Sequence, residues 1–181
     1  AAHPTVPAYW PDSSKPTNPG YDGRWGNPLA ISERDYSGYS DTDFSSVRGT
    51  FSVNLNFNKW VKGLSADGKF DYRLNNNFVK TFNKSFDYHD YNYDTEEYTV
   101  IGTFNGGKNS LREEYAKDWL WYSMFKLNYD RIFAKKHHIT GLALVEAQAN
   151  KNDNFFAYRE GFISTEVDEM FAGSDENKNN G

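Results

Sequence analysis

Apolar and polar residues alternate almost without a break between residues 46 and 75. Before the segment NKWVKG, one side of the pattern carries Val47, Phe51, Val53, Leu55 and Phe57, and the other carries Arg48, Thr50, Ser52, Asn54 and Asn56. After it, one side carries Leu64, Ala66, Phe70, Tyr72 and Leu74, and the other carries Ser65, Asp67, Lys69, Asp71 and Arg73. Because successive side chains of a strand point to opposite faces, this pattern predicts two strands. The short connection predicts an antiparallel hairpin.

A second hairpin is predicted over residues 119–150. Its apolar side carries Trp119, Trp121, Phe125, Leu127 and Tyr129 before the turn AKKHH, and Ile139, Gly141, Ala143, Val145, Ala147 and Ala149 after it. Its polar side carries Lys126, Asn128, Asp130, Thr140, Glu146, Gln148 and Asn150, and Leu142 and Leu144 interrupt it.

The remaining segments are polar and less regular. Residues 1–45 hold all 6 prolines of the chain and predict mostly loop, with one helical turn at NPLA (27–30). Residues 76–118 predict a long, polar, twisted hairpin, with a turn at NGGKNS. Within them SLREEYAK also fits a helical turn, because Ser110 precedes Glu113 as in a capping box. Residues 151–181 predict a loop with a single helical turn.

Short turns alternate with long polar segments, and this asymmetry bears on the fold class. Strands of about ten residues with short turns at one end and long loops at the other are typical of outer-membrane β-barrels. Aromatic residues lie near the ends of the apolar stretches, as in interfacial girdles: Trp60 and Phe133 at the turns, and Trp119, Trp121 and Tyr122 at the opposite end. A soluble β-sandwich explains the alternation equally well, although it explains the loop lengths less well.

Composition narrows the function classes. The chain has 181 residues, a formal net charge of -5 and no cysteine. Its basic residues are scattered, so we expect no nucleic-acid surface, and the missing cysteines exclude a disulfide framework. No stretch approaches the ~20 apolar residues of a membrane-spanning helix. Both ends lie in polar loops, from which we expect a segment of a longer polypeptide.

The sequence patterns that point to catalytic or metal-binding residues are weak. His137 and His138 are adjacent, so in a strand they point to opposite faces. Asp67 and Asp71 alternate with Lys69 and Arg73, which is typical of a charge ladder. The segment FDYHDYNYDTEE (86–97) is acidic, but it lacks the spacing of an EF-hand loop and predicts a solvated loop. We therefore expect no enzyme, no catalytic residue, no metal and no cofactor.

Aromatic residues in the first loop are candidates for ligand contact. Tyr9, Trp10, Tyr21 and Trp25 could stack on sugar rings or grip a peptide. Alternatively, they pack the loop on itself or on a partner protein.

Several motifs, taken in order, are similar to those of a known family. They are NPLA (27–30), FNKWVKGLSADGKFDY (57–72), LNYDRIFAKKHHITGLALVEAQ (127–148) and DEMFAG (168–173). The chain resembles the SusC/RagA family of TonB-dependent outer-membrane transporters of Bacteroidota. The resemblance implies a middle portion of a large barrel, an antiparallel up-and-down transmembrane β-barrel, without the plug domain.

The resemblance also implies a role. The whole protein would be a multi-pass outer-membrane importer of oligosaccharides or peptides that works with a SusD-like surface lipoprotein and with TonB, through the plug region. Residues 1–45 would be mostly an extracellular loop, 76–118 a long extracellular hairpin region and 151–181 a loop, and residues 46–75 and 119–150 would be wall hairpins. The alternative is a secreted, aromatic-rich β-sandwich that binds glycan.

The resemblance also implies what each side of the predicted sheet would contact. Membrane lipid would meet Val47, Phe51, Val53, Leu55, Phe70, Tyr72, Phe125 and Leu127. The lumen or plug would meet Arg48, Asp67, Lys69, Asp71 and Arg73, which cross-strand ion pairs can satisfy. Placing that polar set in lipid would cost ~2–4 kcal/mol for each basic residue near the midplane, so the register is strongly specified.

Overall fold

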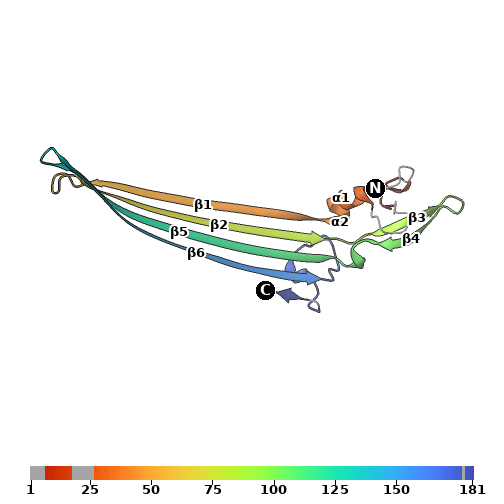
Figure 1. Ribbon diagram of the computed structural model, residues 1–181. Coiled ribbons are helices and arrows are strands. Elements are labelled where there is room, and N and C mark those ends of the chain that lie inside the picture. The colour runs from red at the N-terminus through yellow and green to blue at the C-terminus, as the bar shows by residue number, and fades with distance from the viewer. Residues whose placement is uncertain (1–6, 18–26, 177) are drawn as a thin grey trace. The chain divides into compact units, whose positions relative to one another are not determined.

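A computed structural model describes residues 7–17, 27–176 and 178–181. Antiparallel strands dominate it, and its helices are few and short (Figure 1). The long strands are β1 (Gly38–Asn56), β2 (Leu64–Asn83), β5 (Ser110–Phe133) and β6 (His137–Glu160). The shorter elements are α1 (Pro28–Ser32), α2 (Arg34–Ser37), β3 (Asp87–Asn92), β4 (Glu97–Thr103), η1 (Phe104–Gly107), η2 (Met170–Ala172) and β7 (Asn179–Asn180). The predicted all-β, antiparallel class is confirmed.

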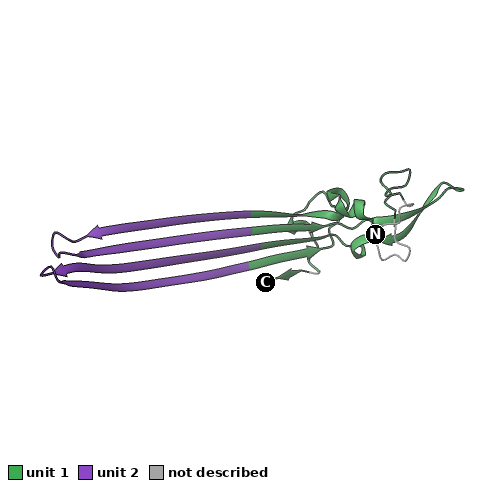
Figure 2. Cartoon of the chain, turned by 45° about the horizontal axis from the view of Figure 1, so that its top comes forward, with its two compact units in different colours: residues 1–43, 78–114, 155–181 green, residues 44–77, 115–154 purple. Residues whose placement is uncertain are grey.

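The main sheet has the strand order β1-β2-β5-β6-β7, and β3 and β4 form a separate two-stranded sheet. The chain divides into two compact units (Figure 2). Unit 1 comprises residues 1–43, 78–114 and 155–181, and unit 2 comprises residues 44–77 and 115–154. Unit 2 therefore contains the two predicted hairpins with their short turns.

The long strands extend beyond the predicted bounds. They have 19, 20, 24 and 24 residues in chain order, where the alternation predicted about ten for each. The helical alternative for SLREEYAK is wrong, because residues 110–117 belong to β5. Backbone pairing with neighbouring strands outweighs a local capping signal there. The predicted helical turn at NPLA is confirmed as α1, whose Asn27 cap accepts hydrogen bonds from the amides of Leu29 (3.1 Å) and Ala30 (3.2 Å).

Unit 1 has a small apolar core. Phe82 and Leu111 are fully buried, Phe162 is 6% exposed, and Tyr39, Met170 and Ala172 pack against them. Phe82 and Phe162 meet edge to face with ring centroids 5.2 Å apart. This core fixes the 161–172 segment on the strands of unit 1.

Between β2 and β5, the polar hairpin predicted over residues 76–118 is confirmed as the pair β3 and β4. It is shorter than predicted, because residues 76–83 belong to β2 and residues 110–118 to β5. Its register runs from Asp87 opposite Thr103 to Asn92 opposite Glu97, with an irregularity between Tyr88 and His89. The turn predicted at NGGKNS begins with η1. The loop predicted over residues 151–181 is wrong for residues 151–160, which belong to β6, where pairing with the neighbouring strand continues. Residues 161–169 do form a loop, and the single helical turn that follows is η2.

Candidate functional site

One face of unit 2 holds a network of charged and polar side chains. Asp71 is 6% exposed and accepts hydrogen bonds from Arg48 Nη2 and Thr50 Oγ1, both at 2.8 Å. Asp67 lies 3.0 Å from Lys126 Nζ and accepts from Asn54 and, at 2.8 Å, from Asn128. These contacts join β1, β2 and β5 across a single face. Lys69 and Arg73 alternate with the two aspartates and are exposed.

The opposite face of unit 2 is apolar. Gly68 and Val53 lie on this face, because a Cβ on Gly68 would be 3.0 Å from Val53 Cγ1. Gly141 and Tyr129 also lie on one face, because a Cβ on Gly141 would be 3.8 Å from Tyr129 Cβ. The residues predicted to meet lipid have exposed fractions between 38% at Tyr72 and 68% at Phe51, except Leu127, which is half-buried. On β6, Ile139 and Val145 add exposures of 51% and 68%. Soluble monomers rarely expose so continuous an apolar surface.

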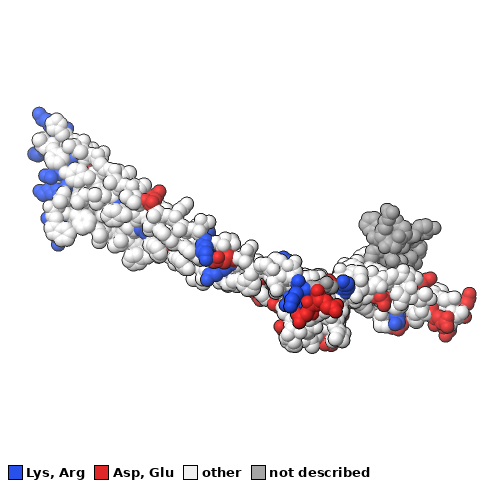
Figure 3. Space-filling model, turned by 90° about the horizontal axis from the view of Figure 1, so that it is seen from below, with Lys and Arg blue, Asp and Glu red and all other residues white. Residues whose placement is uncertain are grey.

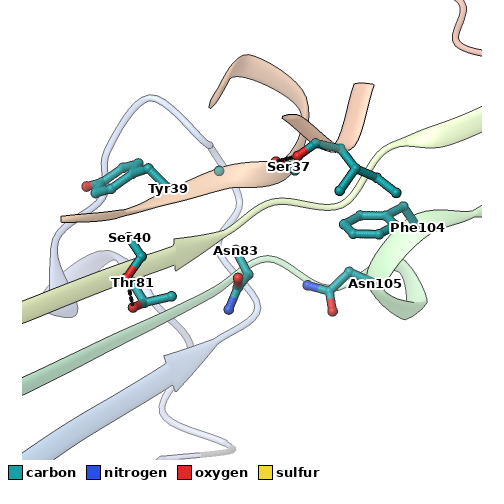
Figure 4. A pocket seen from close by; sticks show the side chains of 9 residues that line it. Ser37, Tyr39, Ser40, Thr81, Asn83, Phe104 and Asn105 are labelled. Carbon is teal, nitrogen blue, oxygen red and sulfur yellow. Dashed lines mark hydrogen bonds between the residues drawn. The ribbon is translucent and has the colours of Figure 1, made fainter. Parts of the chain in front are cut away.

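Unit 1 contains an open pocket of about 280 Å³ (Figure 4). It is lined by Ile31, Ser37, Gly38, Tyr39, Ser40, Thr81, Asn83, Phe104 and Asn105. Gly38 positions one wall, because its φ is +93° and a Cβ there would lie 1.8 Å from the carbonyl oxygen of Phe82, which excludes any side chain. The Ser40 and Thr81 hydroxyls are 2.9 Å apart and hydrogen-bonded. None of these lining residues is charged.

The far wall of this pocket comes from η1. Phe104 stacks on Phe86 with ring centroids 5.0 Å apart, and its amide donates to the Phe86 carbonyl at 2.8 Å. Asn105 has a φ of 56°, and its side chain extends from η1 toward Asn83 of β2 in Figure 4. Hydroxyls, amides and two aromatic rings, those of Tyr39 and Phe104, are groups that suit a neutral, hydroxyl-bearing ligand. Sequence reasoning treated NGGKNS only as a turn, and so it missed this pocket.

The aromatic candidates of the first loop pack within unit 1. The Tyr9 ring lies 5.8 Å from Tyr36, and burial, with Glu33 nearby, raises the pKa of Tyr9 to about 12. Trp10 Nε1 donates to the His89 carbonyl at 2.6 Å, and its ring lies 6.1 Å from Tyr91. Both are half-buried. Tyr21 and Trp25 lie outside the described residues.

A charged cluster in unit 1 holds the 161–172 segment. Lys80 Nζ lies 3.4 Å from Glu169, 3.6 Å from Asp168 and 3.8 Å from Glu113. Tyr39 donates a hydrogen bond to Asp168. That hydrogen bond lowers the pKa of Asp168 against the opposing effect of burial, and Lys80 lowers it further. The three carboxylates thus share the single ammonium group of Lys80, which is the arrangement of a structural ion-pair network.

The residues considered as metal ligands in the sequence make other hydrogen bonds or ion pairs. His138 Nε2 lies 2.8 Å from Asp130 Oδ1, and Asp87 accepts from Thr103 Oγ1 at 2.7 Å. Burial, with a smaller effect of Lys15, lowers the pKa of His89. Within residues 7–17, 27–176 and 178–181, no group of three or more His, Asp or Glu residues could hold a metal ion. No helix in these ranges is long and apolar enough to cross a membrane.

Comparison with known proteins leaves the family open. Neither a scan against models of protein families nor a search of curated proteins finds a match. The SusC/RagA resemblance therefore stays a prediction.

Proposed function

We propose that this chain is a wall segment of a TonB-dependent, SusC-like outer-membrane importer of oligosaccharides or peptides. The observation that carries the proposal is the contrast between the two faces of unit 2. One face exposes Phe51, Val145 and their apolar neighbours, and the other buries Asp71 against Arg48 and Thr50. A barrel wall needs this division, because lipid meets one face and a polar interior meets the other.

Strand length and open edges also support the proposal. A tilted membrane strand needs about 9–11 residues, and β5 and β6, with 24 each, can cross and continue beyond the membrane. The main sheet begins at β1, and in the described part of the chain no strand pairs with the outer edge of β1. Such an edge needs a neighbour within a bilayer, and further strands of a longer polypeptide would supply it.

The proposed mechanism gives this chain a passive role. A SusD-like lipoprotein would capture the ligand at the cell surface, extracellular loops would complete the binding cavity, and TonB would displace a plug. This chain would supply wall strands and loops. The uncharged pocket of unit 1, with Asn83, Phe104 and Asn105, would offer hydrogen bonds and a ring surface to an oligosaccharide.

A secreted glycan-binding β-sandwich is the second candidate. The same pocket favours it, since hydroxyl, amide and aromatic groups suit sugars in either setting. The two candidates differ in what covers the apolar face of unit 2: membrane lipid in the first, and a second protein layer in the second.

Neighbouring positions on β1 allow a direct test. The chain has no cysteine, so Val53→Cys and Ser52→Cys can each carry one environment-sensitive fluorophore, in the native polypeptide reconstituted in liposomes with any other cysteine replaced. We expect nitroxide-labelled lipid to quench the label at position 53 strongly and the label at position 52 weakly, because the two side chains face opposite sides. Equal quenching, or none at position 53, would contradict the barrel and favour the sandwich.

A further inference from the structure

Two basic turns lie side by side at one end of unit 2. They are the turn between β1 and β2 (residues 57–63) and the turn between β5 and β6 (residues 134–136). The amide of Asp130, near the second turn, donates to the carbonyl of Gly63, which ends the first, at 2.8 Å. This end of unit 2 therefore presents both turns together.

Basic side chains predominate there. Lys59, Lys62, Lys135 and Lys136 are all exposed, and the guanidinium of Arg131 lies 4.5 Å from the Phe133 ring. Near these turns, the carboxylate of Asp130 is hydrogen-bonded to the ring of His138. Figure 3 shows Lys and Arg gathered at the end of unit 2, next to a largely uncharged stretch of strand surface. This concentration contrasts with the net charge of -5 for the whole chain.

An exposed tryptophan stands among these lysines. Trp60 is 81% exposed, and its ring stacks on Phe57 with centroids 5.7 Å apart. The turn that carries it is well ordered by hydrogen bonds: the Trp60 amide donates to the Phe57 carbonyl at 2.8 Å, and the Gly63 amide donates to Asn58 Oδ1 at 2.6 Å. The hydrogen-bonded backbone of this turn thus presents the indole outward, next to the exposed Lys59 and Lys62.

We propose that this turn surface, Lys59, Trp60, Lys62, Lys135 and Lys136, binds anionic phospholipid headgroups. The inference rests on the proposed function and adds a lipid class to it. Ammonium groups attract anionic phosphates, and an indole prefers the level of the headgroups, where its ring is apolar and its N–H is wet. An acidic protein would explain the lysines but not the exposed Trp60 beside the apolar face of the same strands.

Tryptophan quenching in liposomes tests the inference. The native polypeptide is reconstituted with brominated phosphatidylglycerol or brominated phosphatidylcholine, and the signal of Trp60 is isolated by subtracting the Trp60→Phe variant. We expect the relative association constant to favour phosphatidylglycerol by about fivefold at low salt, the effect of roughly 1 kcal/mol from one engaged lysine, and to fall as salt rises.

Charge variants provide the matched control. Replacing Lys59, Lys62, Lys135 and Lys136 together by Gln should abolish the preference for phosphatidylglycerol, whereas replacing the same residues by Arg should retain it. An unchanged preference in the Gln variant, or equal quenching by both lipids in the wild type, would overturn this inference and leave the proposed function standing. If neither brominated lipid quenches Trp60, both the inference and the membrane location are overturned.

Discussion

At the scale of single residues, the buried or half-buried aspartates of unit 2 are stabilised by hydrogen bonds and ion pairs from neighbouring strands. Asp67 and Asp71 are four residues apart on one face of β2, and each is held by neighbouring strands: Asp71 by Arg48 and Thr50, Asp67 by Lys126 and two asparagines. The sequence predicted a charge ladder along β2. The cross-strand partners that neutralise it come from β1 and β5, far apart in the chain.

Gly63 gives a prediction at this scale. Its φ is +89°, and a Cβ there would lie 2.1 Å from the carbonyl oxygen of Asp130. We expect Gly63→Ala to lower the free energy of unfolding by more than about 1 kcal/mol, because the new methyl group strains the backbone and pushes β5 away. Urea unfolding of the reconstituted protein measures this change.

Gly49 is the matched control for Gly63. It lies in β1 of the same unit, and a Cβ there would meet nothing within 4 Å. We expect Gly49→Ala to be close to neutral, since alanine fits an extended strand at least as well as glycine. A loss as large as that of Gly63→Ala would show that the close approach to Asp130 is not the cause.

At the scale of elements, long-range pairing set the length of each strand. Residues 110–118 are mostly polar and resemble a capped helix locally, yet they belong to β5. Their polar groups are satisfied across strands: Asp118 accepts from Asn75 Nδ2 at 3.0 Å, and Tyr115 donates to Asn76 at 2.9 Å. A sequence window contains no information on such partners, so the alternation marked only the central part of each strand.

The 161–172 segment should respond to pH through Asp168. The hydrogen bond from Tyr39 lowers the pKa of Asp168 below its ordinary value of 3.8. The released segment would thus bind a proton at a higher pH than the docked one, so the contact stabilises docking fully above that value and is lost as the pH falls through the lowered pKa. Hydrogen exchange of residues 161–172, corrected for intrinsic rates, should accelerate on acidification.

The Tyr39→Phe variant separates this contact from general acid unfolding. We expect it to reduce the protection of the segment by about 1 kcal/mol near neutral pH and to match the wild type at pH values where Asp168 is protonated. Glu166→Gln, in the exposed part of the same loop, should change neither value. A Tyr39→Phe effect that persists unchanged in acid would assign the protection to the Phe82 and Phe162 core instead.

At the scale of the whole molecule, a barrel wall segment would belong to a longer polypeptide. We expect the native polypeptide that contains VRGTFSVNLNF to be recovered from the outer-membrane fraction with a mass several times the 20.9 kDa of this sequence, together with a surface lipoprotein. Intact-mass spectrometry of that fraction provides the measurement. A detergent-free, cooperatively folding monomer of 20.9 kDa in the soluble fraction would be the contrary result and would favour the sandwich.

The sequence by itself determined the two-faced character of the strands, the positions of both short turns and the helical turn at NPLA. These features follow from local rules: the period of two in side-chain direction, and the preferences of Gly, Asn and Pro for particular backbone angles. Only the tertiary structure decided how far each strand runs, which cations neutralise Asp67 and Asp71, and which residues line the pocket beside Gly38. Those depend on segments that meet across the sheet, and the pattern within one strand does not encode its distant partners.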